Sequence, residues 1–119
     1  MASLRRRELT YINRCAILLT PKLPYIAWAN SLDTTGPRFD DTAFDKDGPA
    51  VFLIPSVDYL DDAQGFIHAN FNVFFEHWLD AWCTDQSCWP HPRTWPMFQE
   101  WFDWHVHSVV MDAADAPLG

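Results

Sequence analysis

The stretch that decides the fold is DDAQGFIHANFNVFFEHWLDAW, residues 61–82, the longest segment of the chain with a helical period. Its large apolar side chains recur at three- and four-residue steps, which places them on one stripe of a helix: Ile67, Phe71, Phe74, Phe75, Trp78 and Trp82. Asp61, with Gln64 three residues later, forms a capping-box pattern and predicts that the helix begins there. Burying each large side chain contributes about 1.5–3 kcal/mol, so this helix needs an apolar partner surface.

The composition excludes several classes of protein. A chain of 119 residues that is 49% hydrophobic and holds seven tryptophans is expected to fold as one ordered domain. Its net charge of −8 disfavours nucleic acids and anionic membranes as partners. Three cysteines without a secretion signal fit a reducing cytoplasm, and no apolar run reaches the length of a membrane span.

The elements around the long helix follow from changes of hydrophobic period. An apolar run bounded by proline predicts a strand, whereas steps of three and four predict a helix. Thr94 is expected to cap a helix that has Trp95 and Pro96 in its first turn. The expected elements are, in chain order, a strand at 12–20, a helix at 24–32, a strand at 50–55, the long helix, a helix at 95–102 and a strand at 104–111.

This order, β-α-β-α-α-β, predicts a single two-layer α+β domain with a three-stranded mixed sheet packed with helices. The β-α-β start favours a right-handed parallel crossover. We expect the domain to span residues 12–112, between a flexible basic arm at 1–11 and a tail at 113–119. The first two strands are apolar on both faces, so either helices cover both sides of the sheet or one face meets a second copy. A homodimer is therefore the expected partner.

Short motifs at both ends of the domain resemble a known family. They are Asn13-Arg14, Ala16-Ile17 and Pro21-Lys22-x-Pro24-Tyr25-x-x-Trp28 at the start, and Trp89-Pro90, Phe98-x-x-Trp101-Phe102 and His107-Ser108-Val109-Val110-x-Asp112 at the end. Together they resemble a family of small bacterial proteins without an assigned function. The resemblance covers residues 12–112, implies a cytoplasmic bacterial protein and supplies no catalytic residues. The long helix of that family is glutamate-rich on its polar face, whereas this chain has His68, Asn70, Asn72 and His77 there.

His105 and His107 are the main candidates for chemistry. They lie two residues apart on an expected strand, so both side chains point to one face. Two imidazoles in this arrangement can bind zinc or relay a proton, and Asp103 lies next to them in the sequence. A transition-metal site needs three or four ligands, however, and this strand supplies two. The alternative is a pair of hydrogen-bonded histidines at a half-buried surface.

A second candidate is the C-x4-C-x2-H pattern of Cys83, Cys88 and His91. Zinc sites usually carry a C-x2-C pair and a second paired set, so free, partly buried thiols are the simpler interpretation. A nucleophilic Cys88–His91 pair lacks a third, orienting group in the sequence. No phosphate-binding glycine motif occurs, so we expect no cofactor.

Six of the seven tryptophans crowd into residues 78–104. Stacked aromatic rings in a core explain them most simply, whereas the alternative is a groove for a ligand or peptide lined by Trp89, Trp95, Trp101 and Trp104. The leading functional hypothesis is a binding or interaction module that acts as a homodimer. The alternative is a small metal-dependent or hydrolase-like enzyme that uses His105 and His107.

Overall fold

The structure, a computed structural model, describes residues 9–32 and 50–114. Its elements are, in chain order, β1 (Thr10–Tyr11), β2 (Arg14–Pro21), α1 (Leu23–Leu32), β3 (Ala50–Pro55), α2 (Leu60–Trp82), the short 3-10 helix η2 (Gln86–Cys88), α3 (Trp95–Trp101), β4 (Phe102–His107) and β5 (Met111–Asp112). The arm residues 1–8, the link at 33–49 and the tail residues 115–119 lie outside the described residues. The α+β class predicted from the sequence is confirmed.

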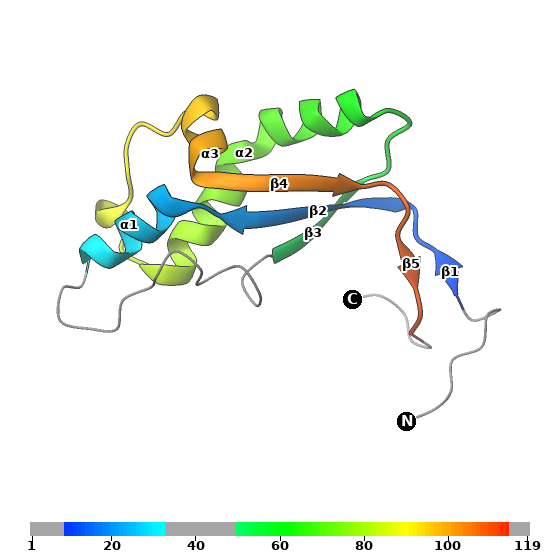
Figure 1. The fold of residues 1–119 in the computed structure, drawn as a ribbon, viewed down its shortest axis with the longest axis horizontal. Coiled ribbons are helices and arrows are strands. Elements are labelled where there is room, and N and C mark those ends of the chain that lie inside the picture. Colours follow the sequence, from blue (N-terminus) through cyan, green and yellow to red (C-terminus); the bar gives the residue numbers. More distant parts are fainter. Residues whose placement is uncertain (1–8, 33–49, 115–119) are drawn as a thin grey trace.

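The main sheet has three strands in the order β3-β2-β4, and both strand pairs are antiparallel. The predicted mixed sheet and parallel crossover were therefore wrong. Leu19, near the end of β2, pairs with Ala50 at the start of β3, so the connection through α1 leaves and re-enters the sheet at the same end (Figure 1). The apolar pattern of β2 and β3 is the same for either direction and could not reveal this return.

A separate two-stranded sheet joins the ends of the described chain. β1 pairs antiparallel with β5, and the amide N–H of Ile12 donates to the carbonyl of Val110 at 2.8 Å. The strand expected at 104–111 is thus two strands, since β4 ends at His107 and the chain turns before β5 begins. Thr10 and Tyr11, expected in the arm, form β1.

The long helix α2 packs as its apolar stripe predicts. Ile67, Phe75 and Trp78 are buried in the core, whereas Trp82 remains 38% exposed. The predicted capping box at Asp61 is wrong, because α2 begins at Leu60 and its N-cap position, Tyr59, makes no side-chain capping bond. The packing of the stripe sets the position of this helix, and the cap does not.

Among the described helices, α2 and α3 pack against one face of the main sheet, and α1 continues from the end of β2 and packs into the same core (Figure 1). The side chains of this inner face come from alternate positions of the strands, and those of Cys15, Ile17, Leu19, Ile54 and Phe102 are almost completely buried. Thr94 caps α3, as predicted, by accepting from the amide of Met97 at 3.3 Å. Indole N–H groups fasten the helices further: Trp82 donates to the carbonyl of Ala29 at 2.9 Å.

No helix within residues 9–32 and 50–114 is long and apolar enough to cross a membrane.

Candidate functional site

The second face of the main sheet, which we call the open face, points away from α2 and α3. Strand alternation and register assign its members: Arg14, Ala16, Leu18 and Thr20 of β2, Val51, Leu53 and Pro55 of β3, and Asp103, His105 and His107 of β4. In the part of the chain that the structure describes, no helix covers this face. Of the two alternatives expected from the sequence, the one in which helices cover both sides of the sheet is therefore not met among the described residues.

The open face is apolar toward one edge and polar toward the other. On the edge strand β3, Val51 is 59% exposed and Leu53 is 48% exposed, although both are aliphatic. The central strand adds Leu18, which is half-buried, and Ala16, which is buried at 9% exposure. On the other edge strand, β4, the corresponding positions are His105 opposite Leu18 and His107 opposite Ala16. The face is therefore amphipathic across its width.

His105 and His107 share the open face, as their spacing predicted. A nitrogen of the His105 ring, Nε2, lies 3.3 Å from a carboxylate oxygen of Asp103, so these two side chains are in contact. Both are well exposed, at 63% and 59%, and water screens their attraction. The carboxylate can orient the imidazole for proton transfer. Among the described residues no group of three histidines, cysteines or carboxylates is placed to hold a metal ion.

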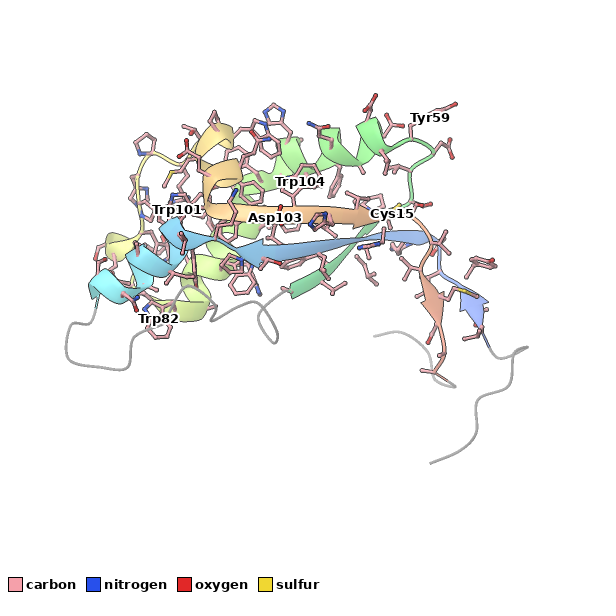
Figure 2. All side chains as sticks on the ribbon, viewed as in Figure 1. Cys15, Tyr59, Trp82, Trp101, Asp103 and Trp104 are labelled. Carbon is pink, nitrogen blue, oxygen red and sulfur yellow. The ribbon has the colours of Figure 1, made fainter. Side chains whose placement is uncertain are left out.

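A hollow of about 450 Å³ adjoins one end of the open face. Asp103 and Thr20 form part of its wall, and the turn from β2 into α1, which includes Lys22, and the start of α1 form the rest. The ammonium of Lys22 donates to the carbonyl of Gln99 at 2.9 Å, which ties this turn to α3. Figure 2 shows Asp103 on β4 and Trp104 between β4 and α2. A smaller hollow of about 220 Å³ lies between α2 and β4, where Trp104 and His105 contribute to the wall.

The cysteines and His91 of the second candidate pattern lie in the loop after α2. Cys83 and Cys88 are half-buried and form no disulfide. The ring of His91 contacts the carbonyl of Gln86 at 3.5 Å and the guanidinium of Arg93 at 3.3 Å. Neither contact gives His91 a role in binding a metal or activating a thiol.

The four tryptophans of the predicted groove lie in aromatic packing. Trp89 is buried and donates to the carbonyl of Cys83 at 2.8 Å. The remaining three contact neighbouring rings. Trp95 stacks on His68 and Phe98, whereas Trp101 packs at a tilt against Phe75 and Trp28, and Trp104 packs at a tilt against Trp95. Trp104 is the member that also borders a hollow. A ligand groove at these residues stays a prediction.

Sequence reasoning missed a polar cluster centred on Arg93. This guanidinium donates to Asn72 at 2.7 Å and Glu76 at 3.0 Å on α2, and to the carbonyl of Pro90 at 3.0 Å. Its side chain is only 10% exposed, and it also lies 5.7 Å from the centre of the Trp89 ring. The spacing of Asn72 and Glu76, four residues apart on one helix face, was the available signal. This cluster fixes the loop before α3 to the polar side of α2.

Comparisons with protein-family models, curated proteins and solved structures found no match. The resemblance to the small bacterial family stays a prediction.

Proposed function

We propose that this chain is a cytoplasmic protein–protein interaction module and that its open face binds a second copy of the same chain. The main support for the proposal is the exposure of Val51 and Leu53. Both lie on the open face of β3, next to the central strand β2. Aliphatic side chains that emerge at i and i+2 of one strand form a continuous strip, and contiguous apolar surface is typical of interaction sites.

Charge supports a second copy as the partner. Each chain has a net charge of −8, so two copies repel each other wherever their acidic surfaces meet. The open face has one carboxylate, Asp103, which is in contact with His105, and it also has the cation Arg14. Two acidic molecules can therefore meet at this face without bringing many carboxylates of one copy close to those of the other. A two-fold axis across the strands would place the strip of Val51 and Leu53 against its own copy.

The dimensions of the face predict a weak dimer. Three strands spaced about 4.8 Å apart and six residues long, at about 3.3 Å each, give a surface of about 14 Å by 20 Å. A standard stable interface buries about 800 Å² on each partner, well above what this face offers. We therefore expect self-association at high micromolar protein concentration, with monomer prevailing on dilution.

The test is sedimentation equilibrium across a wide range of protein concentrations. Val51→Lys places a charge within the strip, and we expect it to abolish self-association. Val73→Lys is the matched control, since Val73 is also an exposed valine, at 67%, but lies on the outer side of α2. We expect Val73→Lys to associate like the wild type. Circular dichroism checks that both variants remain folded.

Two results would reject the proposal. One is a wild-type protein that stays monomeric up to millimolar concentration. The other is association that Val51→Lys and Val73→Lys weaken equally, because the open face would then have no special role.

A second candidate function is general acid–base catalysis, as in a small hydrolase. The contact between His105 and Asp103 favours it, because Asp103 also borders the hollow of about 450 Å³. A substrate in that hollow would lie next to the carboxylate-oriented imidazole. The expected signature is hydrolysis of a simple activated ester that His105→Gln reduces at least tenfold while His107→Gln retains it. Equal rates for wild type and His105→Gln would reject this candidate.

A further inference from the structure

The loop that follows α2, residues 83–88, brings two thiols together outside the open face. Cys83 is the C-cap residue of α2, and its amide donates to the carbonyl of Leu79 at 2.9 Å. Five residues later, Cys88 ends the 3-10 helix η2. The side chain of Asp85 caps this short helix by accepting from the amide of Ser87 at 3.0 Å and its hydroxyl at 2.8 Å. The loop is therefore a closed, internally bonded turn.

One oxygen atom shows how near the two cysteines are. The carbonyl oxygen of Asp85 accepts from the thiol of Cys83 at 3.7 Å and from the amide of Cys88 at 3.0 Å. The sulfur of one cysteine and the backbone of the other thus contact the same atom. The nearby thiol of Cys83 is also the largest of the effects that raise the pKa of Cys88.

The indole of a buried tryptophan, Trp89, and that of a partly buried one, Trp28, hold the backbone at the two cysteines. The carbonyl of Cys83 accepts from the ring N–H of Trp89 at 2.8 Å, and the carbonyl of Cys88 accepts from that of Trp28 at 3.0 Å. These bonds fix both cysteines to the core while both thiols remain half-buried and open to small reagents. The third cysteine differs, because Cys15 is 1% exposed within the inner face of the sheet.

We propose that Cys83 and Cys88 form a reversible disulfide within the chain by exchange with a low-molecular-weight disulfide such as oxidised glutathione. The loop lies outside the open face, so formation of this disulfide does not depend on self-association. Because a reducing cytoplasm keeps thiols free, the bond would form when the glutathione pool becomes oxidised.

The exchange takes place in two steps. The thiolate of Cys83 attacks one sulfur of oxidised glutathione; the disulfide of glutathione breaks, one glutathione leaves, and Cys83 carries the other as a mixed disulfide. Cys88 then loses its proton and attacks the Cys83 sulfur, which expels the second glutathione. The two thiol protons leave with the two glutathione molecules. The cysteines are oxidised by two electrons, and one oxidised glutathione is reduced.

We take Cys83 as the attacking sulfur and Cys88 as the resolving one. The Cys83 thiol is half-buried and donates to the carbonyl of Asp85 at 3.7 Å. The pKa of Cys88 is raised, chiefly by the Cys83 thiol beside it, in agreement with a resolving role.

The experiment equilibrates the folded protein with glutathione buffers of increasing oxidised fraction, traps free thiols and measures intact mass. We expect the wild type to lose two hydrogen atoms, and peptide mapping to join Cys83 to Cys88. Cys88→Ser should instead accumulate one glutathione on Cys83. Cys15→Ser is the control and should close the disulfide like the wild type. Tryptophan fluorescence offers a second readout, because Trp28 and Trp89 bond the backbone of the two cysteines and a disulfide there should quench them.

Three results would overturn the proposal. The wild type could accumulate glutathione without closing the internal bond, or link two chains rather than one. It could also keep both thiols free in the most oxidising buffer, which would show that the loop holds the sulfurs apart. The fluorescence readout has its own control. If the fluorescence changes equally in the wild type and in a Cys83→Ser, Cys88→Ser double variant, a disulfide is not the cause of the change.

Discussion

The two faces of the main sheet are built from the same strands and have opposite surroundings. On β3, Ile54 is 2% exposed and its neighbour Leu53 is 48% exposed. On β4, Phe102 lies in the aromatic core, whereas the next residue, Asp103, lies in the open. Helices α2 and α3 cover the first face, and no described helix covers the second. The comparison separates residues that hold the fold from residues that are available for binding.

The difference in exposure between the two faces shows that apolar character alone does not identify the core residues of this protein. Leu53 and Val51 are as hydrophobic as the residues beside them, but they contribute little to folding because water still reaches them. Residues kept apolar without burial are candidates for contact with a partner. Substitutions at adjacent residues of one strand, one on each face, test whether the two faces contribute differently to the free energy of unfolding.

The largest effect is expected on β4. Phe102→Ala should lower the free energy of unfolding by about 3–5 kcal/mol, because its ring packs against Tyr25, Phe75 and Phe98 and would leave a cavity. Asp103→Ala, one residue along, should change it by about 0.5 kcal/mol or less. Chemical denaturation monitored by tryptophan fluorescence measures both. Similar losses for the two variants would mean that the faces do not differ energetically.

The edge strand β3 gives a second adjacent pair. Ile54→Ala should cost about 2–5 kcal/mol because a buried side chain is truncated, and Leu53→Ala should cost less than about 1 kcal/mol. Both variants lose the same number of aliphatic carbons, so a difference between their losses of stability reflects the difference in burial. Denaturant midpoints measured in dilute protein, where any dimer has dissociated, provide the comparison. A large loss for Leu53→Ala in dilute solution would indicate that the open face is covered within the single chain.

Tyr25 tests how helix α1 is held to the inner face. Its hydroxyl donates to the carbonyl of Trp78 at 2.7 Å, so Tyr25→Phe should cost about 1 kcal/mol at neutral pH. Burial also raises the pKa of this hydroxyl. An unfolded tyrosine ionises near pH 10, and above that pH the unfolded chain releases a proton that the folded chain keeps. The contribution of Tyr25 to stability is therefore complete below about pH 10 and falls as the pH rises further.

The measurement for Tyr25 is the free energy of unfolding as a function of alkaline pH. We expect Tyr25→Phe to flatten the decline above about pH 10. Tyr59→Phe is the control, because that ring is 74% exposed, and it should leave the decline unchanged. If Tyr25→Phe and wild type lose stability in parallel, burial of this hydroxyl is not the cause of the alkaline decline.

The start of α3, a short helix at the edge of the core, provides a further test. Thr94→Ala removes the oxygen that caps this helix and should cost about 0.5–2 kcal/mol. Thr94→Ser keeps that oxygen and should retain most of the stability. Thermal unfolding followed by circular dichroism distinguishes the two, and an equal loss in both variants would assign the effect to the methyl group rather than to the cap.

The sequence predicted individual elements better than their assembly. The stripe on residues 61–82, the strand at Ala50–Pro55 and the cap at Thr94 could all be predicted, because period, flanking prolines and cap chemistry are local. The face shared by His105 and His107 followed from strand alternation in the same way. The sequence could not predict the contact between Asp103 and His105, the shared acceptor of Cys83 and Cys88, or the polar cluster around Arg93. Those depend on rotamers and on loop closure.

The sequence by itself determined that this chain forms helices with aromatic stripes around strands apolar on both sides. Only the tertiary structure decided that the strands are antiparallel and that the helices gather on one face. The physical reason is that a strand's apolar pattern is independent of its direction, and burial depends on where the connecting helices pack. The long helix at residues 61–82 could therefore be read from its sequence, whereas the open face behind the sheet it covers could not.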